Sequence, residues 1–296
     1  MSRWLVTGAS GTLGRDLVRM LDLAGEDCLG FGRNRLDRDG LDITSPAAVR
    51  DTLLSYRPDV VVNCAAWTSV DAAEANEEAA LAVNGTAVAG LASACRDIGA
   101  VMVQVSTEYV FDGTARSPYR EDHLPAPRTA YGRTKLAGEQ AVLSALPDAA
   151  YIVRTAWLYS AHRRGFVGAM LDRARAGMPS SVVDDQRGQP TWTRDVATRI
   201  HALVSAKAPP GIYHATSSGE ATWYGLARSV YQLAAADPFL VQPVGADAYP
   251  HSALRPRYSV LGHNAWATVG ISPISNWRDA LRRAYPAVAE LTSHTG

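Results

Sequence analysis

Lysine is almost missing from this chain of 296 residues: of its 29 lysines and arginines, only Lys135 and Lys207 are lysines. Cysteine is also scarce, and the three cysteines, Cys28, Cys64 and Cys95, lie far apart without a Cys-x-x-Cys pair. An odd, scattered set of this kind is typical of reduced thiols in a cytoplasm. It argues against a disulfide framework or a zinc site, and we expect no bound metal.

Net charge is absent as well, because 29 basic residues balance 29 acidic ones. A protein that binds nucleic acid or a membrane surface needs a basic field, so we expect neither partner. No apolar run approaches the ~18–20 residues that cross a bilayer. The opening MSRWLVTG lacks the apolar core of a signal peptide. Together these features predict a cytoplasmic protein.

Short β-branched runs alternate with longer helical patterns in the first half of the chain. We expect strands at residues 3–7, 28–31, 60–63, 101–106 and 151–154, and helices at residues 13–23, 46–54, 77–96 and 131–146. Several of the strands are apolar on consecutive residues, as expected for strands that are covered on both faces. The alternation predicts an α/β fold built on a doubly wound parallel sheet, the Rossmann arrangement.

The alternation weakens after about residue 158, where Gly and Pro separate shorter elements. One more helix is expected at 195–206 and one more strand at 211–214. We therefore assign residues 1–158 plus 193–215 to a dinucleotide-binding domain. Residues 159–192 plus 216–296 are expected to form a smaller substrate-binding lobe.

A glycine-rich turn, GASGTLG, joins the first expected strand to the first expected helix. Its glycines, Gly8, Gly11 and Gly14, are spaced as GxxGxxG, a relative of the dinucleotide-binding fingerprint. The first permits a tight turn, the second lets backbone N–H groups approach a pyrophosphate, and the third lets helix and strand pack closely. The turn predicts a dinucleotide cofactor whose phosphates lie at the helix N-terminus.

The end of the second strand indicates which dinucleotide is used. A site that prefers NAD often carries Asp or Glu there, whereas this chain reads FGRNR. Arg33 is placed to pair with a 2′-phosphate, which favours NADPH, with NADH as a second accepted cofactor. The alternative is that Arg33 is an ordinary solvated loop residue. Asp42 and Ile43 are expected to border the adenine.

The rare Lys135 follows Tyr131 by four residues in AYGRTKLAGE, so both side chains leave the same face of one helix. A phenol with a pKa near ~10 exchanges protons poorly at neutral pH. A neighbouring ammonium is expected to lower that pKa. Thr107, at the end of the fourth strand, is expected to hydrogen-bond a substrate carbonyl. The alternative is that Ser106 and Thr107 only cap a turn.

Longer motifs narrow this interpretation. They are NCAAWTSVDAAE (63–74), STEYVFDG (106–113), AYGRTKLAGE (130–139), RTAWLY (154–159), DQRGQPT (185–191) and LRP (254–256). In this order the motifs resemble those of the dTDP-4-dehydrorhamnose reductases, a family of the extended short-chain dehydrogenase/reductase superfamily. The resemblance runs from near residue 7 to near residue 260.

The resemblance implies a role for each site residue. Tyr131 would be the general acid, Lys135 its electrostatic partner and Thr107 the hydroxyl that positions the carbonyl. The cofactor would contact Gly8, Ser10, Gly11, Thr12, Leu13, Gly14, Arg33, Asp42, Ile43, Ala65, Ala66, Trp67, Val105, Tyr131 and Lys135. The dTDP-sugar would contact Thr107, Glu108, Tyr131, Trp157, Gln186 and Arg255, with Trp157 beside the sugar and Arg255 at the diphosphate.

Two residues depart from the family pattern: Glu108 replaces the usual Asp, and Trp67 replaces a smaller aromatic residue or His. The expected activity is NADPH-dependent reduction of the C4 ketone of a dTDP-4-keto-6-deoxysugar, by a monomer or a homodimer. One alternative is the formation of dTDP-dihydrostreptose or another antibiotic sugar. Two others are a nucleotide-sugar epimerase or dehydratase, and a noncatalytic NADP-binding regulatory subunit.

Overall fold

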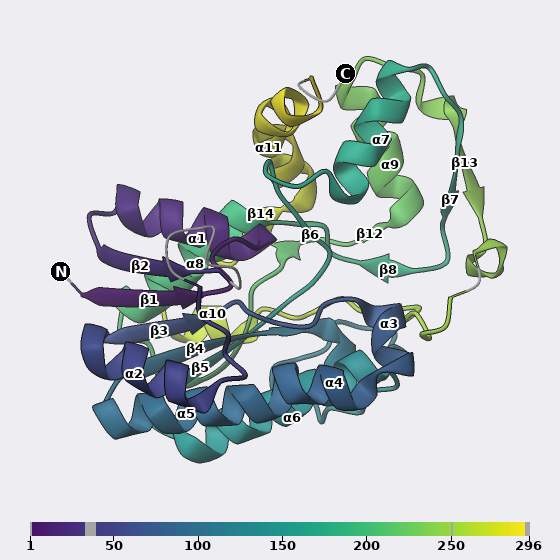
Figure 1. Cartoon of the computed structure of the whole chain (residues 1–296). Helices are drawn as coiled ribbons and strands as arrows, with labels where there is room; N and C mark the ends of the chain where they lie inside the picture. Colours follow the sequence, from purple (N-terminus) through teal and green to yellow (C-terminus); the bar gives the residue numbers. More distant parts are fainter. Residues whose placement is uncertain (1, 33–39, 250, 294–296) are drawn as a thin grey trace.

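A parallel six-stranded sheet forms the centre of the protein (Figure 1). The computed structural model describes residues 2–32, 40–249 and 251–293. In spatial order the strands are β10 (Gly211–His214), β5 (Ala150–Thr155), β4 (Val101–Thr107), β3 (Val60–Asn63), β1 (Arg3–Thr7) and β2 (Asp27–Phe31). Every neighbouring pair of these strands is parallel. The predicted doubly wound α/β fold is confirmed.

Helices cover both faces of this sheet (Figure 1). One face carries α1 (Thr12–Leu23), α8 (Thr193–Ser205) and α10 (Asn264–Thr268). The other carries α2 (Pro46–Tyr56), α5 (Ala87–Ile98) and α6 (Ala130–Ala145). In β3, Val60 and Val62 enter the first hydrophobic core and Val61 enters the second. Burial on both faces is why this strand is apolar at consecutive positions.

The strand order reverses between β1 and β3, because the chain runs from β1 outward to β2 and returns on the other side. Ligands of open α/β sheets collect at such a switch point, outside the carboxyl ends of the strands. Here those ends are followed by Gly8 after β1 and Cys64 after β3. The fold therefore places the glycine turn beside the loop that follows Asn63.

Local sequence signals explain several helix boundaries. Ser45 accepts a hydrogen bond from the Ala48 N–H and precedes Pro46, the first residue of α2. The predicted helix at 77–96 is interrupted: it consists of α4 (Glu77–Leu81), a π-helical turn η1 (Ala82–Thr86) and α5. The preceding helix α3 (Val70–Ala75) was not predicted.

By length and composition alone, the continuous helical segment Glu77–Ile98 is long and apolar enough to cross a membrane, which differs from the expectation that no segment approaches this length. In this fold 44% of its apolar window is buried inside the protein. Its apolar residues Val88, Leu91 and Cys95 belong to the hydrophobic core beneath the sheet. A core helix passes the same test, so this segment is accounted for by its packing on the sheet.

A second group of elements lies beyond the carboxyl edge of the sheet (Figure 1). Its helices are α7 (Gly165–Arg175), α9 (Trp223–Leu233) and α11 (Trp277–Ser293), with the short turns η3 (Pro238–Leu240) and η4 (Ala246–Ala248). Its strands form pairs: β6 (Leu158–Tyr159) with β9 (Thr191–Trp192), β7 (Ser180–Val183) with β13 (Val241–Val244), β8 (Arg187–Gly188) with β12 (Ala221–Thr222), and β11 (Ser217–Ser218) with β14 (Ile274–Asn276). This group encloses a hydrophobic core of its own.

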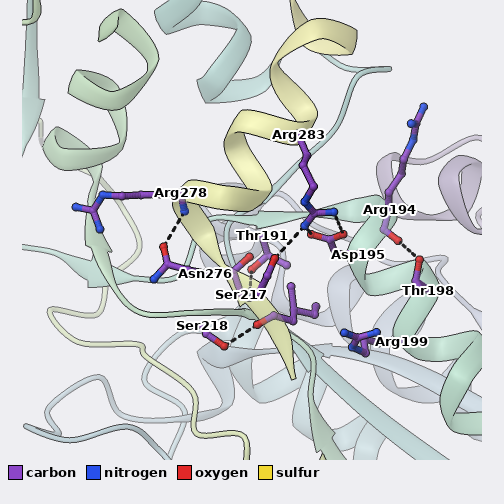
Figure 2. A network of polar contacts seen from close by, with 12 residues as sticks. Thr191, Arg194, Asp195, Thr198, Arg199, Ser217, Ser218, Asn276, Arg278 and Arg283 are labelled. Atoms are coloured by element: carbon purple, nitrogen blue, oxygen red, sulfur yellow. Dashed lines mark hydrogen bonds and ion pairs between the residues drawn. The ribbon is translucent and has the colours of Figure 1, made fainter. Parts of the chain in front are cut away.

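Polar contacts join this group to the helices on the sheet. Figure 2 shows Arg283 reaching from α11 to Asp195 on α8, with two N–O distances of 3.0 and 2.8 Å. Arg283 also donates to the Ser275 hydroxyl at 2.9 Å. The guanidinium groups of Arg194 and Arg283 both lie over the Trp192 ring, at 5.2 and 5.6 Å from its centre.

Candidate active site

A cavity of about 840 Å³ runs along the carboxyl edge of the sheet. The glycine turn after β1 and the loop after β3 form one end of its wall. The ends of β4 and β5 form the other, together with Tyr131 and Lys135 from α6. The cavity therefore brings together segments that are far apart in the sequence.

The glycine turn is built for close backbone approach. Gly8 has φ of 64°, and a Cβ placed on it would lie 2.6 Å from the Ala65 nitrogen. A Cβ on Gly14 would collide with the Gly8 carbonyl oxygen. Gly11 precedes α1 and has no side chain to cap the helix, so the first-turn N–H groups there are free to meet an anion. This turn fits a cofactor diphosphate, with Gly8, Gly11 and the following Thr12 and Leu13 in the cavity wall.

Most of the predicted cofactor residues line this cavity. They are Gly8, Ser10, Gly11, Thr12, Leu13, Asp42, Ile43, Ala65, Ala66, Trp67, Val105, Tyr131 and Lys135. Gly14 is buried behind the wall, where it packs against Gly8. Arg33, the predicted partner of a 2′-phosphate, lies outside the described residues. The Asp42 carboxylate accepts hydrogen bonds from the backbone and hydroxyl of Thr44.

Asn84 holds the loop that carries Trp67, and sequence reasoning missed it. Its side-chain oxygen accepts from the Trp67 N–H at 2.9 Å, and its amide donates to the Trp67 carbonyl at 3.1 Å. The same amide donates to the Thr134 hydroxyl on α6 at 3.1 Å. Asn84 lies in the π-helical turn η1, a distortion that is frequent at functional sites. The signal in the sequence that could have indicated this site is the pair Asn84-Gly85, which interrupts the apolar pattern of the helix predicted at 77–96.

Two glycines of AYGRTKLAGE set the position of α6. A Cβ on Gly132 would collide with the Tyr109 carbonyl oxygen, and one on Gly138 would collide with the Asn84 carbonyl oxygen. Thr129 caps the helix by accepting from the Gly132 N–H at 3.0 Å. Close packing on both neighbours therefore fixes where Tyr131 enters the cavity.

Tyr131 and Lys135 both face the cavity, but their electrostatics differ from expectation. Lys135 Nζ donates to the Val105 carbonyl at 2.7 Å, and burial lowers the pKa of its ammonium to about 8. Burial, followed by the charge of Glu108, raises the pKa of the Tyr131 phenol, whereas a hydrogen bond with Thr107 lowers it. The prediction that Lys135 lowers this phenol pKa is wrong here, because burial and Glu108 raise the pKa and Lys135 is not among the groups that shift it.

Thr107 and Glu108 are linked at the end of β4. The Thr107 hydroxyl donates to Glu108 Oε2 at 2.6 Å and accepts from the Tyr109 N–H at 3.2 Å. Thr107 therefore also caps the short turn η2 (Glu108–Val110), as the alternative interpretation proposed. Glu108 is 5% exposed, and burial raises the pKa of its carboxyl to about 7. The Tyr109 ring meets the Tyr131 ring edge-on, with centres 5.6 Å apart.

A second cavity of about 500 Å³ adjoins the first, and Glu108, Tyr109 and Trp157 line both. Trp157 has φ of 46°, and its ring stacks on the Trp223 ring with centres 3.7 Å apart. A Cβ on Gly188 would collide with the Trp157 ring, so this glycine makes room for the stack.

The other predicted substrate residues, Gln186 and Arg255, line only the second cavity. Arg255 donates to the Tyr109 hydroxyl at 3.2 Å and forms an ion pair with Asp71 on α3. Asp71 also accepts from the Ala253 N–H at 3.1 Å, which ties this stretch to α3. Among the described residues, no group of three or more His, Cys, Asp or Glu side chains is placed to hold a metal ion.

Comparisons with known proteins show which family this chain belongs to. Residues 2–290 match the family described as RmlD substrate binding domain. The chain is 52% identical over 290 residues to the dTDP-4-dehydrorhamnose reductase of Streptomyces griseus, covering 97% of this chain and 94% of that protein. It is 51% identical over 284 residues to the dTDP-4-keto-6-deoxy-D-glucose reductase of Streptomyces niveus, covering 96% of each.

A solved structure resembles the whole fold. The dTDP-4-dehydrorhamnose reductase of Bacillus anthracis in complex with NADP superposes with a TM-score of 0.90 at 33% identity, covering 96% of this chain and 99% of that one. The fold thus defines a Rossmann enzyme of the extended short-chain dehydrogenase/reductase class. Within that class, this chain belongs to the RmlD substrate binding domain family.

Proposed function

We propose that this protein reduces the C4 ketone of a dTDP-4-keto-6-deoxysugar with NADPH. The observation that carries this function is the convergence of Thr107, Tyr131 and Lys135 on one cavity wall, beside a glycine turn that fits a diphosphate. Relatives that are about half identical over nearly the whole chain are named as reductases of dTDP-4-keto sugars, which supports the same reaction.

Each residue of this group has a chemical task in the proposed reaction. NADPH, when bound, supplies the hydride that reduces the ketone. Tyr131 donates its phenol proton to the ketone oxygen, and its raised pKa keeps the phenol protonated at neutral pH. Thr107 positions the ketone oxygen. Lys135, still mostly cationic below pH 8, counters the negative charge that forms on the phenol oxygen.

The second cavity is the proposed site for the nucleotide end of the sugar substrate. Its aromatic wall includes Trp157 and Trp223, and Gln186 and Arg255 offer polar groups. Arg255 would exchange part of its contact with Asp71 for the diphosphate. We propose residues 159–192 plus 216–296 as the substrate-binding lobe and the remainder as the dinucleotide-binding domain, with α10 packing on the sheet from within the range of the lobe. Arg33 is proposed to select NADPH over NADH.

A panel of dTDP-4-keto sugars, assayed with NADPH and with NADH, tests the function. We expect one sugar to consume NADPH in equal amount, with NMR showing a new C4 hydroxyl. An epimerase or dehydratase would change the sugar without net consumption of NADPH. A regulatory subunit would bind NADP and leave every sugar unchanged. The NMR spectrum of the product also decides between a rhamnose-type sugar and an antibiotic sugar such as dTDP-dihydrostreptose, which we propose as alternative products.

A further inference from the structure

Three polar side chains form a chain where the two cavities join: Glu108 lines both cavities, and Thr107 and Tyr131 line the first. The Thr107 hydroxyl lies close enough to Tyr131 to lower the pKa of its phenol through a hydrogen bond. The Thr107 hydroxyl in turn donates to Glu108 Oε2 at 2.6 Å. Thr107 and Glu108 are 4% and 5% exposed, so bulk water does not compete freely for these bonds.

The direction of this chain depends on a single proton. A hydroxyl has one proton and two lone pairs, and Thr107 already accepts from the Tyr109 N–H. While Glu108 is charged, Thr107 donates its proton to the carboxylate and has none for a ketone oxygen or for a phenolate at Tyr131. When Glu108 is protonated, it can donate to Thr107. The Thr107 proton is then free to meet the ketone oxygen and, after Tyr131 has given up its proton, the phenolate.

We propose that Glu108, in its protonated form, orients Thr107 and Tyr131 for catalysis and afterwards supplies the proton that restores Tyr131. This proposal rests on the reductase function proposed above. The sequence alone marks Glu108 only as a departure from the family pattern. The position of its carboxyl next to Thr107 is what assigns it a proton-holding role.

The proposed proton transfers balance. The Tyr131 O–H bond breaks as its proton joins the oxygen of the reduced ketone, leaving a phenolate. Thr107 passes its proton to the phenolate and takes the proton of Glu108. Glu108 is left as a carboxylate, and a proton from solvent entering through the cavity restores the acid. Each bond that breaks is replaced by a new O–H bond, and no further oxidant or reductant is needed.

The groups around Glu108 are consistent with this role. Tyr109 beside it and Tyr131 from α6 are neutral phenols with raised pKa values. Arg255, from the stretch that follows η4, faces Glu108 and lowers the pKa of its carboxyl, but this guanidinium is also paired with Asp71. Burial is the largest influence and brings the pKa of Glu108 to about 7. Glu108 is therefore able to hold and release a proton near neutral pH.

Activity is expected to depend on the protonated form of Glu108. Because the pKa of this carboxyl is about 7, kcat should be high below pH 7 and should fall as the pH rises through 7. The test is the pH profile of kcat between about pH 5.5 and 9. It compares the wild type with Glu108→Gln, Glu108→Asp and Thr107→Val, and uses Glu78→Gln, an exposed carboxylate on α4, as the control.

Glu108→Gln keeps an N–H donor for Thr107 but holds no transferable proton. We expect kcat to fall roughly tenfold and its decline near pH 7 to disappear. Thr107→Val should remove the decline too, while Glu108→Asp and Glu78→Gln should keep it. The separate decline near pH 8, where Lys135 loses its charge, should remain in every variant. If Glu108→Gln retains the decline near pH 7, another group causes it and the proposal is wrong.

A second measurement does not depend on turnover. Titration of ¹³C-labelled Glu carboxyls by NMR, with the Glu108 signal assigned by its loss in Glu108→Gln, reports the protonation state directly. We expect Glu108 to titrate near pH 7, well above the other carboxyls. A normal acidic titration would overturn the proposal, and if Glu108→Gln does not fold, the loss of the Glu signal in Glu108→Asp gives the same assignment. Failure of the wild type to reduce any keto sugar would instead overturn the proposed function and leave this titration interpretable.

Discussion

The two ends of the active-site cavity differ in the groups that form their walls: backbone groups at one end and side chains at the other. At the diphosphate end, backbone groups form the wall, because Gly8 and Gly14 leave no room for side chains. At the sugar end, side chains form the wall, and Thr107 and Glu108 are buried polar groups joined by a short hydrogen bond. Cofactor binding at the diphosphate end should therefore be sensitive to added side-chain atoms. The reaction at the sugar end should be sensitive to the loss of protons and hydrogen-bond donors.

This difference separates binding from chemistry. A backbone cradle at a helix N-terminus holds an anion without any titrating group, so it should work equally well across neutral pH. The side-chain end contains Glu108 and Lys135, whose pKa values of about 7 and 8 lie near working pH. We expect cofactor affinity to be nearly independent of pH in this range, whereas turnover is not.

The largest effect is expected from Tyr131→Phe, which removes the proton donor but keeps the ring. We predict that kcat falls by about 10²–10⁴-fold, the usual contribution of a general acid. The affinity for NADPH, measured by fluorescence titration, should change little. Tyr56→Phe removes a remote hydroxyl that donates to Asp27 and serves as the control. A Phe variant that keeps most of its activity would refute the role of Tyr131.

Gly14→Ala should damage the other end. The added Cβ collides with the Gly8 carbonyl, so the turn must shift, and we predict a loss of about 1–3 kcal/mol in the free energy of unfolding. NADPH binding should weaken by roughly tenfold. Gly90→Ala in α5 meets no neighbouring atom and should stabilise the helix by up to about 1 kcal/mol. Equal outcomes for the two variants in urea unfolding and NADPH titration would contradict the backbone cradle.

Gly188→Ala sharpens the comparison, because it places a similar collision at the sugar end. The new Cβ would displace the Trp157 ring from its stack on Trp223. We predict that KM for the sugar rises roughly tenfold, equivalent to about 1.4 kcal/mol, while KM for NADPH stays within about twofold. Steady-state kinetics with each reactant varied in turn measures both. A parallel rise in the two KM values would show that the ends are not separable.

The smallest effect is expected away from both ends. Arg283→Ala removes the ion pair with Asp195 seen in Figure 2, whose arginine side chain is 50% exposed. We predict a loss below about 1 kcal/mol in the free energy of unfolding by urea, as for other exposed pairs. A changed kcat would mean that the contact between α8 and α11 reaches the reaction, which the comparison does not predict.

The features that were predicted correctly from the sequence are those that depend on residues close together in the chain. Strands β1, β3 and β10 begin and end where expected, and the apolar runs of β1 and β3 reflect burial on both faces. The glycine turn and the Tyr131–Lys135 pair were found because their spacing carries the geometry. The family assignment is confirmed by the comparisons. The individual roles of the site residues stay predictions.

Other features depend on contacts between distant segments. The π-helical turn at Asn84 exists where this side chain closes the backbone of Trp67, a partner 17 residues earlier. The positive φ of Trp157 goes with its stack on Trp223. The raised pKa of Tyr131 follows from burial, which no spacing rule reports. Such features become visible only when the fold brings the segments together.

Transfer of deuterium from C4-deuterated NADPH to the sugar tests the central claim most directly. With deuterium on the face of nicotinamide C4 that gives up the hydride, we predict one deuterium at C4 of the reduced sugar for each NADPH consumed. In the same reaction time, Tyr131→Phe should give almost no deuterated product. A product that lacks deuterium at C4, or that forms without consuming NADPH, would contradict it.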